Sequence, residues 1–342
     1  PCGLIVAEPM RERTLSARDR LRMDGLAVLY VVANATAAQC GGGYYLFFPG
    51  LAALSHDTLS RPWGKWASQP WRLIVTPALA AALGTAITRA FPYRVLTVLL
   101  VVAGCLLLLA LLRSSISPAI AAGTLPLVLG IKSWFYPAST ALGLIALVSI
   151  VWPWQKRYRR RYRGTDQASA RGFDGLRGTS STGYKWILPF FLFLTVMASC
   201  AALSGFRLIL FPPLIVMAYE MFAHPTSCSW AERPLAFPTA CCLTALGGWL
   251  AVSVFGSGGT AAGCAMLVGV GVLRLLHLNL PPVLAIGLLP LVIDSPGLEY
   301  PLYVSIGTAA LTVVFLLYRR WVVGHGQAPV GGDVPGAGHH GR

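Results

Sequence analysis

The chain has 342 residues, of which 56% are hydrophobic and only 11% are charged, whereas a soluble domain carries roughly 25% charged residues. This composition excludes a water-soluble globular protein, because so much apolar surface can be hidden only in a lipid bilayer. The net charge of +15 lies before the first apolar run, between the two halves and after the last run, which is the positive-inside pattern of a membrane protein. No aromatic-interleaved basic face accompanies it, so no nucleic-acid partner is expected.

The first half reads as a basic segment followed by one membrane unit. Residues 1–24 are polar and basic and are predicted to be cytoplasmic. The unit, 25–153, is predicted to hold four apolar spans and two shorter pieces that contain Pro and Gly. At about 1.5 Å per residue the short pieces cannot cross a hydrocarbon core of roughly 30 Å. The predicted spans are 25–40, 73–90, 95–112 and 137–153, and the short pieces are 44–55 and 117–131.

The second half restates this order after a connector. Residues 154–185 are basic and then rich in Gly, Ser and Thr, which predicts a flexible cytoplasmic linker. The second unit is predicted at 186–318, and the Gly-, Pro- and His-rich tail, 319–342, is predicted to be disordered. The predicted spans are 186–204, 234–253, 260–276 and 301–318, and the short pieces are 207–219 and 280–293.

One motif occurs twice in the chain. Residues 118–128 and 282–292 are identical at seven of eleven positions, with an offset of 164. The identities include two Pro and one Gly, which break the backbone pattern of an apolar run and so carry more information than shared Leu or Val. Outside the motif, an offset of 164 pairs Tyr136-Pro137 with Tyr300-Pro301, and an offset of 163 pairs Leu83-Gly84 with Leu246-Gly247. We therefore predict a tandem duplication.

The three basic segments also constrain the topology. If all of them face the cytoplasm, each unit crosses the membrane an even number of times, and the two units run parallel. We predict an all-α polytopic membrane protein made of two parallel-oriented tandem repeats, each with about four full spans and two short or broken helices. It is expected in the cell membrane as a multi-pass protein with both termini cytoplasmic.

The two copies of the motif form the predicted substrate site. A helix that begins at Pro118 or Pro282 has free N–H groups in its first turn, and its dipole favours an anion there. Arg113 and His277 share the offset of 164 and lie just before these prolines. The alternatives are a Pro-kinked packing helix for the motif and an interfacial position for Arg113 and His277. The predicted substrate-binding residues are Arg113, Pro118, Gly123, Thr124, His277, Pro282 and Gly287.

Few other residues suggest chemistry. His56 and Glu220 also lie 164 residues apart. A buried imidazole or carboxylate can relay a proton in a membrane protein, but the polar surroundings of both residues equally suit a membrane interface. The eight cysteines include no Cys-x-x-Cys pair, and no metal-binding or nucleophile motif occurs. No catalytic residue, metal or cofactor is therefore predicted.

Proline-containing segments in both halves carry a family resemblance. Leu280-Pro281-Pro282 stands in the motif, and Ser68-Gln69-Pro70 and Glu232-Arg233-Pro234 stand upstream of other spans. This pattern resembles the HPP family of integral membrane proteins, which has His-Pro-Pro at the first of these places. The resemblance implies a four-span unit and nitrite transport, in which some members are implicated. The chain departs from the family because it lacks the His in both copies and carries the unit twice.

These features together predict a transporter or permease for a small solute, with a small inorganic anion such as nitrite as the expected substrate. A non-transporting membrane scaffold or partner subunit is the alternative, because the basic connector suits anionic lipid or an acidic partner. A membrane-embedded enzyme is less favoured, since the 12 acidic residues are scattered. The expected partners are the lipid bilayer and a small-molecule or ion substrate, and a homo-oligomer remains open.

Overall fold

The computed structural model describes residues 17–43, 46–61, 64–159, 183–225 and 233–326, and within them every regular element is a helix. The first half contains α1 (Ala17–Cys40), α2 (Gly50–Ser60), α3 (Pro70–Ala90), α4 (Val95–Leu111), α5 (Pro118–Leu129) and α6 (Phe135–Arg159). The second half contains η2 (Gly183–Trp186), α8 (Ile187–Ser204), η3 (Arg207–Leu210), α9 (Pro212–Ala223), α10 (Ala236–Phe255), α11 (Gly259–Leu275), α12 (Pro282–Leu288), η5 (Leu289–Val292) and α13 (Glu299–Gly326), where η marks a 3₁₀ helix.

Long apolar helices form much of the outer surface. Among the described residues, five helices are long and apolar enough to cross a bilayer: α3, α8, α10, residues 135–156 of α6 and residues 299–321 of α13. The apolar helices α4 and α11 have 17 residues each. Large side chains stand exposed on these helices, among them Leu96, Leu188 and Leu203 at 77%, 78% and 89%. Such exposure is unfavourable in water and favourable in lipid, so the described helices are compatible with a polytopic membrane protein.

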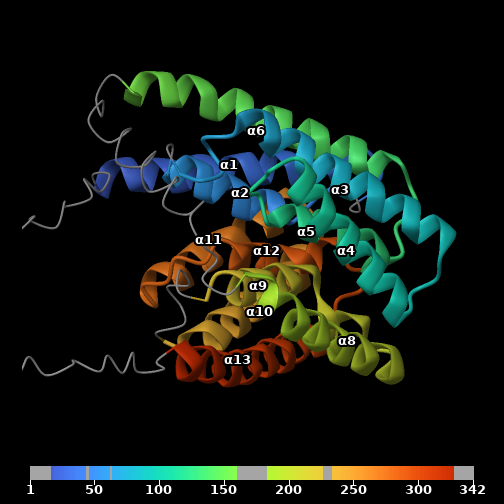
Figure 1. The fold of residues 1–342 in the computed structure, drawn as a ribbon. Coiled ribbons are helices and arrows are strands. Elements are labelled where there is room, and N and C mark those ends of the chain that lie inside the picture. Colours follow the sequence, from blue (N-terminus) through green and yellow to red (C-terminus); the bar gives the residue numbers. More distant parts are fainter. Residues whose placement is uncertain (1–16, 44–45, 62–63, 160–182, 226–232, 327–342) are drawn as a thin grey trace, which may run out of the picture.

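Four short helices, α2, α5, α9 and α12, lie at the centre of the molecule, and α6 and α13 lie on opposite outer sides (Figure 1). All residues of α5 except the last are buried, and all of α12 are buried. Because these residues are covered by protein, neither helix presents an apolar face to lipid. The short helices are therefore enclosed by the long ones rather than exposed to lipid.

The first short helix, α2, runs back along α1. Phe47, just before α2, lines a small space together with Ala35 and Ala38 near the end of α1. Toward the other end of α2, His56 lies 3.3 Å from Asp24 near the start of α1. The 11 residues of α2 span about 16 Å, roughly half of a hydrocarbon core. The polar end of α2 and the basic start of α1 thus lie at the same end of the molecule.

The start of α1 and the ends of α6 and α13 also lie on one side of the molecule (Figure 1). α1 begins at Ala17, within the segment 1–24 that was predicted to precede the first span. No Pro or Gly interrupts the helix between Ala17 and Gly25. Asp19 and Arg22, on successive turns, lie 3.9 Å apart and favour the helix. α6 and α13 likewise continue beyond the predicted span ends, to Arg159 and Gly326. Most of the predicted linker, and the predicted disorder beyond Gly326, lie outside the described residues.

Helices of the two halves pack against each other in matched pairs. α1 packs against α11, and α8 packs against α4. In the centre, α2 packs against α12, and α9 packs against α5. Each half thus places its first long helix and its first short helix on the other half. The halves interlock, so the junction between them runs through the middle of the molecule.

Candidate functional site

The motif helices do not present free amides at their starts. α5 begins at the buried Pro118 and α12 begins at the buried Pro282. The amides that follow each proline donate to carbonyls just before the helix, in a tight 3₁₀-type turn. The four bonds are Ala119 N to Ile116 O (3.1 Å), Ile120 N to Ser117 O (3.0 Å), Val283 N to Leu280 O (3.1 Å) and Leu284 N to Pro281 O (3.0 Å). The donors expected to face an anion are thus engaged within the chain, and only the helix dipole still favours negative charge there.

The motif glycines lie at close helix contacts. A Cβ atom added to Gly84 on α3 would overlap the carbonyl of Gly123 on α5, and one added to Gly248 on α10 would overlap the carbonyl of Gly287 on α12. The Cβ of an alanine at Gly123 would itself lie 3.0 Å from the carbonyl oxygen of Ala80. Gly123 and Gly287 therefore let two backbones approach closely. Neither lies against the cavity described below.

Thr124 is buried, and its Oγ1 donates to the carbonyl of Ile120 at 2.9 Å. A threonine hydroxyl has a single donor, and this bond to the preceding turn uses it. Thr124 could reach a solute only if its hydroxyl turned away from its own helix.

A buried tyrosine compensates for the proline inside α5. Pro126 has no N–H, so the carbonyl of Ala122, four residues earlier, loses its helical donor. The hydroxyl of Tyr136, on α6, donates to that carbonyl at 3.0 Å. Tyr136 is fully buried, where an unpaired carbonyl would be costly. The tyrosine, ten residues after the proline, therefore supplies the hydrogen-bond donor that the proline lacks.

The second half contains the same proline–tyrosine arrangement, 164 residues later. Pro290 withholds a donor from the carbonyl of Ile286, and the hydroxyl of the buried Tyr300 donates to it at 2.6 Å. Here the backbone N–H of Leu289 donates to the same carbonyl. The carbonyl of Ile286 is therefore less dependent on its tyrosine than the carbonyl of Ala122. The sequence signal for this role was the recurring Tyr-Pro pair, which pairs Tyr136 with Tyr300.

Arg113 and His277 end helices. Both residues are exposed and have left-handed backbones, with φ of 47° and 52°. Each is the second residue after its helix, α4 or α11, where glycine is favoured because the backbone is left-handed. The residue that follows donates its backbone N–H to a carbonyl in the last turn of the helix. Neither lines the cavity. The closing bonds are Ser114 N to Leu109 O (2.8 Å) and Leu278 N to Leu273 O (2.9 Å).

We expect Arg113→Gly and His277→Gly each to stabilise the protein by about 0.5–1 kcal/mol, because glycine adopts a left-handed backbone without the strain that other residues carry. The measurement is thermal unfolding in detergent micelles. Arg113→Ala, which removes the same charge and keeps the strain, is the control and should not stabilise. Equal stabilisation by Ala and Gly would show that charge, not backbone strain, sets the cost.

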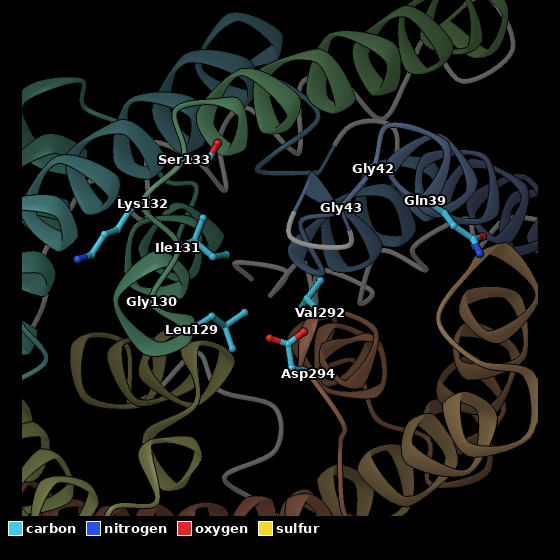
Figure 2. Close-up of a pocket in the computed structure, with 10 residues that line it drawn as sticks. All are labelled: Gln39, Gly42, Gly43, Leu129, Gly130, Ile131, Lys132, Ser133, Val292 and Asp294. Atoms are coloured by element: carbon cyan, nitrogen blue, oxygen red, sulfur yellow. The ribbon is translucent and has the colours of Figure 1, made fainter.

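A cavity lies at the opposite ends of the motif helices, α5 and α12. It has a volume of about 640 Å³ and lies between the end of α1, the end of α5 and the residues after η5 (Figure 2). Its lining combines apolar side chains with backbone, as small-solute sites commonly do. It lies where two segments of the first half face the second half. The lining residues are Gln39, Gly42, Gly43, Leu129, Gly130, Ile131, Lys132, Ser133, Val292 and Asp294.

The charge of this cavity is negative rather than positive. Figure 2 shows the carboxylate of Asp294 pointing toward Leu129, whereas the side chain of Lys132 points away from the space. α5 ends at Leu129 and is capped by Gly130, which has a left-handed φ of 73°, and the carboxyl end of a helix carries partial negative charge. The seven residues predicted to bind substrate are absent from its lining. No sequence pattern singled out Asp294 as a lining residue.

A second polar feature lies at the other end of the short helices. Asp24 on α1 contacts both the His56 ring, at 3.3 Å from its Nε2, and the guanidinium of Arg274 on α11. The side chains of Asp24 and His56 are only 12% and 18% exposed. Three helices from both halves thus meet at one carboxylate. Charges this far from water are retained only when they are paired.

Further charged groups extend this cluster on α2. Asp57 is buried and lies 3.6 Å from Arg61 one turn later. Burial raises the pKa of the Asp57 carboxyl, and the charges of Arg61, His56 and Lys65 offset only part of this rise. Lys65, in the segment after α2, therefore lies within electrostatic reach of Asp57.

Lys65 also lies within electrostatic reach of a carboxylate in the second half, that of Glu220. Glu220, on α9, lies 3.4 Å from His224 one turn later. Burial raises the pKa of the Glu220 carboxyl, but the neighbouring His224, Lys65 and Ser117 outweigh this effect, so the pKa of Glu220 lies below its ordinary value. Glu220 is thus held as a carboxylate. We call the eight residues the charged network: Asp24, His56, Asp57, Arg61, Lys65, Glu220, His224 and Arg274.

The cavity and the charged network are well separated. Gln39 lines the cavity and Asp24 belongs to the network, and both lie on α1, 15 residues apart (39 − 24). At about 1.5 Å per residue they are about 22 Å apart along the helix. Between them lie the buried apolar side chains of the four short helices. The two polar features thus lie toward opposite faces of the apolar core.

No family model, curated protein or solved structure matches the chain. The resemblance to the HPP family therefore stays a prediction. Among the described residues there is also no group of three or more His, Cys, Asp and Glu side chains placed to hold a metal ion.

Proposed function

We propose that the chain is a permease that carries a small solute across the membrane between two like-facing repeats, 25–153 and 186–318. The observation that carries this proposal is the cavity of about 640 Å³ between the ends of α1, α5 and η5. Transporters built from repeats bind their solutes at the junction of the repeats, beside interrupted helices. Irregular backbone at membrane depth is tolerated where it lines such a space.

Matched geometry in the two halves supports the repeat. α4 and α11 have identical lengths and an offset of 164 at both ends. The contact of Gly84 with Gly123 recurs between Gly248 and Gly287 at the same offset. The start of α1 and the ends of α6 and α13 lie on one side of the molecule, which favours repeats that run parallel. With the basic ends in the cytoplasm, the cavity faces the other side of the membrane.

The proposed substrate is a small solute, and the lining of the cavity bears on its charge. An anion such as nitrite, which the HPP resemblance implies, would meet the carboxylate of Asp294 and the carboxyl end of α5. A neutral or cationic solute would meet no such repulsion. The first test therefore compares nitrite, urea and guanidinium, one anion, one neutral molecule and one permanent cation.

We expect purified protein in liposomes to carry at least one of these three solutes faster than empty liposomes, because the cavity admits molecules of this size. We also expect a bulky thiol reagent on Leu129→Cys, in a background whose reactive cysteines are replaced by Ser, to abolish that flux. Leu129 is half-buried and lines the cavity.

Phe91→Cys is the matched control, since Phe91 is 52% exposed in the turn between α3 and α4 and does not line the cavity. The labelled control should keep its flux. No flux of any of the three solutes, or equal inhibition at both labelled positions, would count against a permease that uses this cavity.

A further inference from the structure

The charged network contains groups that a purely structural ion cluster does not need. Its three carboxylates, Asp24, Asp57 and Glu220, are balanced by the three permanent cations Arg61, Lys65 and Arg274. The two remaining members are imidazoles, His56 and His224. With neutral imidazoles the network has no net charge, and with both protonated it has a charge of +2. Histidine is the side chain whose ordinary pKa lies nearest to physiological pH.

The imidazole of His56 has one buried nitrogen, Nδ1, without a hydrogen-bond partner among the described residues. His56 directs Nε2 at the carboxylate of Asp24, 3.3 Å away, which favours the tautomer that carries its proton on Nε2. Nδ1 then holds a lone pair, and it is buried without a hydrogen-bond partner. An unpaired buried acceptor is costly. Protonation at Nδ1 would place the resulting positive charge beside the carboxylate of Asp24.

The two imidazoles occupy related places in the two halves. His56 lies near the end of α2, and His224 directly follows α9, the short helix that takes the place of α2 in the second half. Each lies next to a carboxylate, Asp24 or Glu220. Lys65 interacts with both Asp57 and Glu220 and so links the two pairs. The titratable groups of both halves therefore form one unit across their junction.

We propose that the charged network is the proton-binding site of a proton-coupled permease, in which a proton taken up from water on Nδ1 of His56 is released to water on the other side as the solute crosses. This inference rests on the proposed function. The proton adds to the Nδ1 lone pair and leaves from it, and no other bond changes.

The groups that face these imidazoles define the charge that protonation changes. His56 meets Asp24 from α1 and Asp57 on its own helix. Arg274 reaches the same carboxylate from α11. In the second half, Glu220 lies 3.4 Å from His224 and within electrostatic reach of Lys65 and Ser117, which are outside α9. A proton on His56 would add one positive charge beside Asp24 to a network that is otherwise balanced, at the end of the molecule opposite the cavity.

The test uses proteoliposomes loaded with whichever of nitrite, urea or guanidinium the protein carries, under zero voltage set by valinomycin and equal potassium. For one proton per solute, a pH gradient of about one unit is expected to produce an accumulation ratio of about tenfold, after subtraction of empty liposomes. His56→Gln and Glu220→Gln are expected to give a ratio near one. Glu299→Gln, an exposed acid outside the network, is the matched control and should behave as the wild type.

The outcomes separate the two proposals. A wild-type protein that equilibrates the solute without regard to the pH gradient overturns proton coupling and leaves the permease standing, and this result needs no variant to fold. A protein that carries none of the three solutes overturns both. Wild-type accumulation that survives both substitutions, in protein that elutes as a single species in detergent, overturns the assignment of the proton to this network.

Discussion

Replacing Gly84 by Ala is expected to lower the free energy of unfolding by about 3 kcal/mol or more, at or above the upper end of what overpacking usually costs. The added Cβ would overlap the backbone carbonyl of Gly123. A backbone carbonyl cannot rotate away as a side chain can, so α3 and α5 would have to separate. Gly248→Ala is expected to have the same effect on the contact of α10 with α12. The measurement is equilibrium unfolding in mixed micelles.

Two other glycines, Gly271 and Gly104, serve as comparisons for Gly84→Ala. A Cβ added to Gly271, on α11, meets nothing within 4 Å, and Gly271→Ala should be neutral or should stabilise by up to about 1 kcal/mol, the helix propensity difference. At Gly104 the added Cβ would meet only a side-chain atom of Leu83, at 2.8 Å, and an intermediate loss is expected. If all three substitutions cost the same, the close approach of α3 and α5 is not what stabilises the centre.

The glycine contacts bear on how the two proposed repeats align with each other. The sequence pairs Leu83-Gly84 with Leu246-Gly247 at an offset of 163, but the close contact of Gly84 recurs at Gly248, with an offset of 164. At the offset of 164, Gly247 pairs with Leu83, and Val268 pairs with Gly104. In the first half Gly104 faces Leu83, and in the second half Gly247 faces Val268. Under the proposed duplication, a large and a small residue would have exchanged sides at one interface, which would conserve volume.

The helices themselves followed from hydropathy and from Pro and Gly. The short pieces predicted at 117–131 and 280–293 enclose α5 and α12 with η5, because proline marks their starts. The prediction for α1 began too late, at residue 25, because its first residues are charged. Charge does not stop a helix in the way that Pro or Gly does, and Asp24 is paired inside the protein.

The candidate site was less predictable because its parts come from distant segments. Asp24, Glu220 and Arg274 lie on α1, α9 and α11, and no spacing rule connects them. Only the offset between His56 and Glu220 was visible in the sequence. The cavity lies at the carboxyl ends of α5 and of α12 with η5, whereas the sequence pattern predicted a site at the amino-terminal starts of these helices. Free amides were expected there from the proline alone, and the 3₁₀-type turns that use those amides depend on the residues before it.

Tyr136→Phe is expected to lower the free energy of unfolding by about 1–3 kcal/mol, the cost of leaving a buried carbonyl without a donor. The hydroxyl of Tyr136 donates to Ala122, whose helical donor is missing because residue 126 is proline. Tyr300→Phe should cost less, about 0.5–1.5 kcal/mol, because Leu289 also donates to the carbonyl of Ile286. Unfolding in mixed micelles measures both.

The cause is tested by a double-mutant cycle with Pro126→Ala, which restores the N–H that proline lacks. In that background the carbonyl of Ala122 has a helical donor, so Tyr136→Phe should cost less than about 0.5 kcal/mol. Tyr303→Phe is the control, since the half-buried Tyr303 stacks on Phe206 and its hydroxyl makes no hydrogen bond within the described residues. An undiminished cost of Tyr136→Phe in the Pro126→Ala background would mean that the tyrosine stabilises α5 by packing rather than by replacing the donor that its proline removed.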